Sequence, residues 1–171
     1  MNISEGGESR NLEAALVYLE LGWSIIPVHG IVDGACTCGK PDCDRAGKHP
    51  RINWDEFKER RATEHEIRGW FTKRPESNVG IVTGSISGIC VLDVDGEEGM
   101  TNLINADLEP PETLTSRTGG GGWHFIYRLP EGGIRNSAGK IAEKVDIRGE
   151  GGYIVVPPSN HISGGIYEWE L

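Results

Sequence analysis

The sequence predicts one soluble α+β domain, and three observations support this prediction. Apolar residues recur with the 3.6-residue period of a helix in a few stretches. Elsewhere, short runs rich in β-branched residues and bounded by glycine or proline indicate strands. The chain has 171 residues, of which 37% are hydrophobic and 25% charged, a composition that suits a compact domain with its own core.

Three stretches are expected to be helices. Residues 11–22 place Leu12, Ala15, Leu16 and Leu19 on one face, with Asn11 as N-cap and Gly22 as C-cap. A short helical or turn segment is expected at 54–57. Thr63 and Glu66 form a capping box that opens a second helix, whose core face carries Ile67, Trp70 and Phe71. A third helix is expected at about 97–108, before Pro110 and Pro111.

Strands are expected at 23–29, 78–84, 89–95, 113–118, 123–128, 153–156 and 164–169. Pro27 makes the first of them an edge strand or ends it. Within 123–128, side chains alternate between two faces. The face with Trp123, Phe125 and Tyr127 is expected to be core, which leaves His124 on the polar face.

Two carboxylates end the apolar strand at 89–95. Asp93 and Asp95 lie on one face of that strand, with Cα atoms roughly 6.5 Å apart. Such a pair can share two Mg²⁺ or Mn²⁺ ions about 4 Å apart. Asp-x-Asp-Gly is also ordinary turn chemistry, and this fragment alone favours the turn interpretation.

Further polar side chains strengthen the metal interpretation. Asp146 and Arg148 share a face near another strand end, opposite Val145 and Ile147, and His124 follows the glycine run 119–122. Four glycines allow close approach of a ligand and offer N–H groups to phosphate, although a hairpin turn also explains them. Three carboxylates with a histidine and an arginine are what phosphoryl transfer needs.

A second set of metal-binding residue types lies between 36 and 49. Cys36, Cys38, Cys43 and His49 form a closed Cys₃His set, the ligand count of a structural zinc. The closed set indicates a structural role or a platform for nucleic acid.

No apolar run approaches the ~20 residues of a membrane span, and the N-terminus lacks the features of a signal peptide. A cytoplasmic location is therefore expected, where clustered cysteines indicate metal more than disulfides.

The net charge of −9 argues against a polyanionic partner, but its distribution is uneven. Residues 45–74 carry a net charge of +4 and residues 113–148 a net charge of +3. These two segments could together form a basic groove, or both could be ordinary solvated surface.

The sequence resembles the N-terminal domain of bifunctional DNA primase/polymerases, the Prim-Pol branch of the archaeo-eukaryotic primase superfamily. The motifs that carry the resemblance are residues 22–27, 47–50, 78–81, 91–95, 121–124, 145–149 and 151–159. The resemblance implies a single catalytic domain over 1–171, with an RRM-like sheet, a smaller α/β part and an active site in the cleft between them. It also implies a zinc-knuckle insert at about 36–49 and an origin in a prokaryotic cell, phage, plasmid or other mobile element. Because the chain ends within a strand pattern, it is expected to be the N-terminal part of a longer protein.

The resemblance also implies residue roles. Asp93, Asp95 and Asp146 would bind catalytic Mg²⁺ or Mn²⁺, and His124 would contact the phosphates of the incoming nucleotide. Arg148 and Lys48 are further candidates for triphosphate contacts, together with Gly121 and Gly122. The family often has Ser-x-His at its second motif, whereas this chain has Gly122 in place of the serine.

The expected function is that of a DNA primase and template-dependent DNA polymerase acting on single-stranded DNA with NTPs or dNTPs. A helicase region is a possible further partner in a longer protein, and no membrane partner is expected. Two alternatives stay open: a two-metal nuclease with the same carboxylates, and a non-catalytic zinc-bearing module that binds nucleic acid. A rolling-circle endonuclease is disfavoured because the chain has no His-x-His pair.

Overall fold

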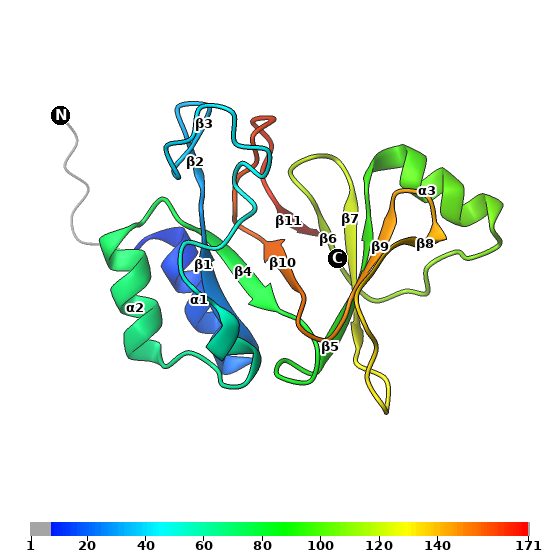
Figure 1. Cartoon of the computed structure of the whole chain (residues 1–171), viewed down its shortest axis with the longest axis horizontal. Coiled ribbons are helices and arrows are strands. Elements are labelled where there is room, and N and C mark those ends of the chain that lie inside the picture. Colours follow the sequence, from blue (N-terminus) through cyan, green and yellow to red (C-terminus); the bar gives the residue numbers. More distant parts are fainter. Residues whose placement is uncertain (1–7, 171) are drawn as a thin grey trace.

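The computed structural model describes residues 8–170 and shows an α+β protein built on two antiparallel sheets (Figure 1). A three-stranded sheet with two helices forms one half, and a six-stranded sheet with one helix forms the other. The predicted fold class is therefore confirmed in its coarse form. None of the helices in the described part of the chain is long and apolar enough to cross a membrane.

The smaller half has the strand order β1-β4-β10, with β1 at Ser24–Val28, β4 at Asn78–Val82 and β10 at Tyr153–Val156. All residues of β1 and β4 are buried, which shows that both faces of this sheet are covered. Helices α1 (Arg10–Glu20) and α2 (Glu64–Lys73) pack against each other and against β1 (Figure 1). As predicted from Pro27, β1 is an edge strand.

The ends of these helices follow from local side-chain chemistry. The capping box of α2 is confirmed, because the Thr63 hydroxyl accepts from the N–H of Glu66 while the Glu66 carboxylate accepts from the N–H of Thr63. The N-cap prediction for α1 was wrong by two residues. Ser9 caps the helix through the N–H of Leu12, and the Asn11 side chain donates instead to the Ser77 carbonyl. Gly22 lies directly after the C-cap residue Leu21 and has φ +85°, the left-handed conformation in which glycine commonly ends a helix.

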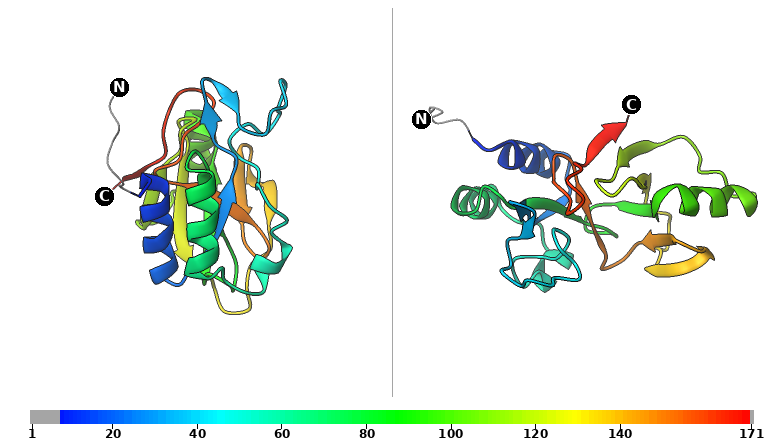
Figure 2. Two further views of the ribbon diagram at one scale, coloured as in Figure 1. Left: turned by 90° about the vertical axis from the view of Figure 1, so that its left-hand side faces the viewer. Right: turned by 90° about the horizontal axis from the view of Figure 1, so that it is seen from above.

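The larger half has the strand order β11-β6-β7-β5-β9-β8, and the strands in space do not follow the order in the chain. The strand bounds are β5 Ile89–Val94, β6 Leu114–Arg117, β7 Trp123–Arg128, β8 Ser137–Ala142, β9 Val145–Arg148 and β11 Glu168–Glu170. Helix α3 (Gly96–Asn105) packs on β8 and β9 (Figure 2). Between them, Leu103, Val94 and Val145 form a small second core. This helix is shorter than predicted, and strand β8, which carries few β-branched residues, escaped prediction.

The prediction of the core face of β7 was wrong. His124 and Ile126 are buried, at 5% exposure each, whereas Trp123, Phe125 and Tyr127 are only half-buried. The reason is that the face of β7 with His124 turns toward the other half of the molecule. The aromatic face lies on the α3 side, and Trp123 and Phe125 only border the second core.

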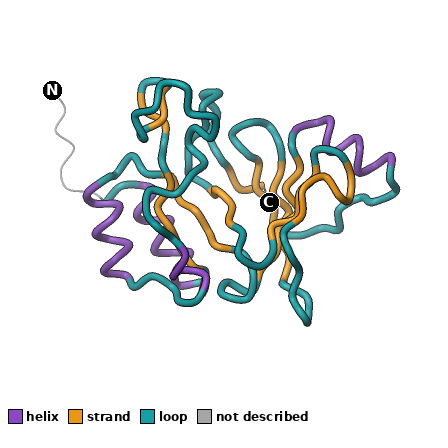
Figure 3. The backbone as a smooth tube through the Cα atoms, in the orientation of Figure 1, coloured by secondary structure: helices purple, strands orange, loops and turns teal. Residues whose placement is uncertain are grey.

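Long connections join these elements (Figure 3). The segment between β1 and α2 holds the short strands β2 (Ile31–Val32) and β3 (Ala35–Cys36), followed by the 3₁₀ helix η1 (Asp55–Lys58). Between the halves, the buried Tyr18 of α1 donates to the Pro157 carbonyl at 2.7 Å and accepts from Trp169 Nε1 of β11 at 2.9 Å. Tyr18 thus connects α1 to the six-stranded sheet.

Candidate active site and metal cluster

A polar cavity of about 670 Å³ lies where the two sheets meet. Its walls come from β5, β7 and β9 on one side and from β10 and the segment before η1 on the other. The predicted residues that line it are Lys48, Asp93, Asp95, His124, Asp146 and Arg148. The structure therefore gathers into one cavity side chains that lie up to a hundred positions apart in the sequence.

Sheet register brings the central residues together. In the antiparallel pairing, Asp93 of β5 lies opposite His124 of β7 and also opposite Asp146 of β9. Directly opposed residues project from the same face of a sheet at short distance. Adjacent strands β7, β5 and β9 thus present an imidazole and two carboxylates side by side.

Arg148 occupies the space between the two carboxylates. Its Nη2 donates to Asp93 Oδ2 at 3.0 Å and to Asp146 Oδ2 at 2.9 Å, and its Nε donates to the same Asp93 oxygen at 3.2 Å. The second oxygen of Asp146 accepts from the N–H of Gly139 at 3.0 Å. The second oxygen of Asp93 lies 3.4 Å from His124 Nε2.

These contacts keep Asp93 ionised. Burial alone would raise its pKa, but the hydrogen bond and charge of His124 and the charge and hydrogen bonds of Arg148 outweigh it and lower the pKa to about 2. The other ring nitrogen of His124, Nδ1, is buried without a hydrogen-bond partner among the described residues. An unpartnered buried nitrogen is unfavourable in a purely structural histidine, and therefore supports a functional role.

Asp95 differs from the other two carboxylates. It follows the end of β5, is exposed, and stands at the N-cap of α3 without a side-chain capping bond. Its carboxylate is therefore free to turn into the cavity that it lines. A carboxylate at this end of a helix is also favoured by the helix dipole.

The glycine run behaves differently from its prediction. The N–H groups of Gly121 and Gly122 bond within the turn, to the carbonyl and the hydroxyl oxygen of Thr118 at 2.9 Å each. They are therefore not available to phosphate, and Gly120 is the member of the run that lines the cavity. Gly122 has a different role: a Cβ there would lie 2.2 Å from the Val94 carbonyl oxygen. Glycine at this position lets the turn pack directly on the end of β5.

Both basic segments of the sequence reach the cavity. Arg45 and Lys48 come from the first segment, and Lys144 and Arg148 from the second. Several other basic residues of the first segment are paired elsewhere, as Arg60 is with Glu56 and Glu66. The predicted basic groove is thus limited to the few cations at the cavity.

Sequence reasoning missed several residues of this cavity, among them Arg45, Tyr153, His161 and Tyr167. Tyr153 is the most informative, because its hydroxyl accepts from Arg45 Nη2 and donates to the Lys48 carbonyl, each at 2.7 Å. Burial raises the pKa of Tyr153, although nearby Arg45 and Arg148 oppose the effect. A tyrosine at the start of a strand gives no sequence signal for such a role.

His161 faces the glycine run. Its Nδ1 lies 3.1 Å from the backbone nitrogen of Ser163 and 2.9 Å from the Ser163 hydroxyl oxygen. Burial and the charge of Lys48 lower the pKa of His161, whereas Asp95 acts in the opposite direction. The ring therefore adds a polar group to this wall of the cavity.

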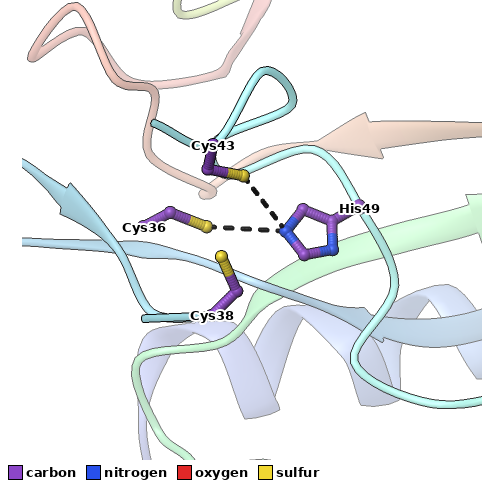
Figure 4. A group of neighbouring side chains, drawn as sticks. All are labelled: Cys36, Cys38, Cys43 and His49. Carbon is purple, nitrogen blue, oxygen red and sulfur yellow. Dashed lines mark hydrogen bonds between the residues drawn. The ribbon is translucent and has the colours of Figure 1, made fainter. Parts of the chain in front are cut away.

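The predicted zinc ligands form a separate cluster. The ligand atoms of Cys36, Cys38, Cys43 and His49 all lie within 4.8 Å of one another, and Figure 4 shows them pointing at a common centre. The Sγ atoms of Cys36 and Cys43 lie 3.6 and 3.5 Å from His49 Nε2. Tetrahedral zinc, with Zn–S of about 2.3 Å and Zn–N of about 2.0 Å, requires a separation of about 3.5 Å between sulfur and nitrogen. The geometry fits a structural zinc ion.

The fold and the site together define a class of protein. This is an α+β domain with a carboxylate-rich, cation-rimmed cavity between two sheets and a separate Cys₃His cluster, a combination suited to handling phosphates with divalent metals. A comparison with protein families identifies one of them: the family model of the N-terminal domain of bifunctional DNA primase/polymerases matches residues 15–171. The chain belongs to this family. No curated protein matches it.

Proposed function

We propose that this domain is a metal-dependent nucleotidyltransferase that makes or extends primers on single-stranded DNA. One observation carries the proposal: in a member of the primase/polymerase family, sheet register places Asp93, His124 and Asp146 side by side in a cavity. The family accounts for the class of reaction, and the cavity provides a place where the reaction can occur.

The donor set of the cavity fits a hard divalent cation. Asp93, Asp95 and Asp146 offer carboxylate oxygens, the ligands that Mg²⁺ and Mn²⁺ prefer. When bound, such ions would lower the pKa of a primer 3′-hydroxyl and neutralise charge on the triphosphate. A metal ligand has to be ionised near neutral pH, and the low pKa of Asp93 ensures this for its carboxylate.

The remaining polar residues fit a triphosphate. Lys48 and Arg45 offer positive charge from the wall opposite the carboxylates, while His124 and His161 offer ring nitrogens. A positively charged, partly enclosed cavity attracts a polyanion and orients it. We assign the incoming NTP or dNTP to this cavity, with its phosphates between these residues and the carboxylates.

Nucleotide incorporation tests the proposal. The zinc-loaded protein is incubated with single-stranded template, Mn²⁺ or Mg²⁺ and labelled nucleotides, with and without an annealed primer. Asp93→Asn and Asp146→Asn should each reduce incorporation by about 1000-fold or more, as losing a ligand to catalytic metal does. Asp107→Asn is a matched control, because Asp107 is exposed beyond the end of α3 and outside the cavity. Full activity in either carboxylate variant would exclude the assigned site.

The same assay separates the alternatives. Shortening of a labelled strand instead of extension would indicate a two-metal nuclease. Template binding that responds neither to nucleotide nor to Mn²⁺ would indicate a non-catalytic nucleic-acid module. We favour synthesis because the family is one of primase/polymerases. Single-stranded DNA is the proposed template, and a helicase region elsewhere in a longer protein is the proposed partner.

A further inference from the structure

The position of Arg148 points to a coupling between metal binding and nucleotide binding. A single nitrogen of its guanidinium, Nη2, bridges Asp93 Oδ2 and Asp146 Oδ2 at 3.0 and 2.9 Å. A divalent metal shared by two carboxylates would occupy the same space between these two oxygens. The chain therefore supplies its own cation where a metal would bind.

The hydrogen bonds of both carboxylates are already satisfied in this arrangement. Asp93 uses one oxygen for Arg148 and presents the other to His124, and Asp146 uses one for Arg148 and the other for Gly139 N–H. The carboxylate oxygens, moreover, are not gathered around a common centre. Within residues 8–170, the Cys₃His set is the one group of three or more potential metal-ligating side chains whose ligand atoms are close enough together to hold a metal ion. The acidic site is thus held in a form that a metal must rearrange.

Arg148 has room to leave. Its side chain is 35% exposed and lines the cavity, and its charge is felt at Tyr153 on the opposite wall. Asp93 and Asp146 are less exposed, at 23% and 28%, and are anchored on paired strands. The arginine is therefore the mobile member of the trio, and phosphate is the other group that a guanidinium binds in a forked geometry.

We propose that Arg148 is an exchangeable counter-ion: it holds Asp93 and Asp146 in the free protein and moves to the phosphates when a nucleoside triphosphate enters, which frees the carboxylates for metal. The inference rests on the proposed function only for the identity of the nucleotide. Metal binding and nucleotide binding then assist each other, and thermodynamic linkage makes this assistance equal in both directions. In the free protein, Arg148 lowers the affinity of the carboxylates for divalent ions.

Mn²⁺ binding without nucleotide or template tests the proposal directly. Free Mn²⁺ is measured by electron paramagnetic resonance during titration of the zinc-loaded protein. Arg148→Gln should bind Mn²⁺ roughly tenfold more tightly than the wild type, because about 1.4 kcal/mol of competition is a modest value for a charge-assisted, partly buried pair. Arg128→Gln removes the same charge from the exposed end of β7, outside the cavity, and should leave the affinity within about twofold of the wild type.

Two additional variants make the result decisive. The double variant Asp93→Asn/Arg148→Gln should lose the gain in affinity, which would locate the extra Mn²⁺ at these carboxylates. Arg148→Lys keeps the charge but lacks the planar fork, and should give a smaller gain. It also serves if Arg148→Gln fails to fold, which the loss of bound zinc and of a cooperative unfolding transition would reveal.

The proposal is overturned if both Arg148 variants bind Mn²⁺ no more tightly than the wild type, or if Arg128→Gln produces the same gain. Because the measurement contains no substrate, it is independent of the reaction. A tenfold gain in Mn²⁺ affinity in Arg148→Gln, together with absent nucleotide incorporation by the wild type, would refute the polymerase assignment and keep the counter-ion role of Arg148.

Discussion

The Cys₃His cluster and the carboxylate site are assembled in opposite ways. The four candidate zinc ligands come from one segment, between Cys36 and His49, and their ligand atoms already lie within 4.8 Å of one another. The carboxylates come from strands that are brought together by sheet pairing, and Arg148 holds two of them. The first site is closed and ready for its ion, whereas the second requires a rearrangement before it accepts one.

This difference fits two different tasks. A structural ion has to be bound permanently, so a closed tetrahedral set is suitable. A catalytic ion has to coordinate substrate as well, so its site benefits from ligands that become available only when substrate is present. The two sites should therefore respond independently to substitution, and the following predictions test that independence.

The largest effect is expected from opening the zinc cluster. Cys43→Ser removes one thiolate, and we expect bound zinc to fall from about one equivalent to less than about half, with a loss of unfolding free energy of about 4 kcal/mol or more. Metal analysis and denaturant unfolding measure both quantities. Cys90→Ser is the matched control, because Cys90 lies on β5 outside the cluster and should retain the zinc. Full zinc content in Cys43→Ser would show that the thiolate is not a ligand.

A smaller effect is expected at the carboxylate site from Gly122→Ala. The added Cβ would lie 2.2 Å from the Val94 carbonyl oxygen, so β5 has to shift, at a cost of about 3 kcal/mol. Nucleotide incorporation should fall while the zinc content stays unchanged. Gly69→Ala in helix α2 meets no atom within 4 Å and should instead stabilise the protein by up to about 1 kcal/mol. Loss of zinc in Gly122→Ala would mean that the two sites are not independent.

The stability of the protein in acid should report on Asp93 of the carboxylate site. Asp93 has a pKa of about 2 in the folded protein against an ordinary value of 3.8, so its ionised form stabilises the fold above about pH 4. This stabilisation, about 2 kcal/mol, is lost as the pH falls through 2. The stability difference between the wild type and Asp93→Asn should therefore shrink as the pH falls from 4 to 2. A constant difference over this range in pH-dependent unfolding curves would contradict the lowered pKa.

The smallest effect is expected where the two halves join. Tyr18→Phe leaves the Trp169 Nε1–H and the Pro157 carbonyl without their partner and should cost about 1 kcal/mol. Tyr127→Phe removes a more exposed hydroxyl bond, to the Pro111 carbonyl, and should cost less. Chemical unfolding ranks the two variants. Equal stability of Tyr18→Phe and the wild type would show that this contact does not stabilise the junction.

Features that depend on local chemistry were predictable from the sequence. The capping box of Thr63 and Glu66, the bounds of β7 and the zinc ligand set all depend on residues close together in the chain. The N-cap of α1 was missed because Ser9 and Asn11 are both good caps, and the competing bond of Asn11 to Ser77 is a tertiary contact.

Features that depend on sheet pairing were less accessible. Residue spacing predicts that Asp93 lies near a strand end, but it cannot show that His124 and Asp146 lie opposite it. Residue types suggested that they belong to one site, and the family resemblance supplied their individual roles. The burial of His124 was misjudged for the same reason, since aromatic neighbours outweigh a histidine in any estimate from hydrophobicity. Tyr153 and His161 had no sequence signal, because their roles arise from the wall opposite the carboxylates.

The contact of Tyr153 with the segment after Cys43 has a wider consequence. The hydroxyl holds Arg45 and the Lys48 carbonyl, and these two residues line the cavity, while the candidate zinc ligands Cys43 and His49 lie on either side of the segment 44–48. Such a segment can be replaced as a unit. Its length and charge can be redesigned while both sheets and the three carboxylates stay in place. The charge of this cavity wall can thus be changed without any change in the carboxylates.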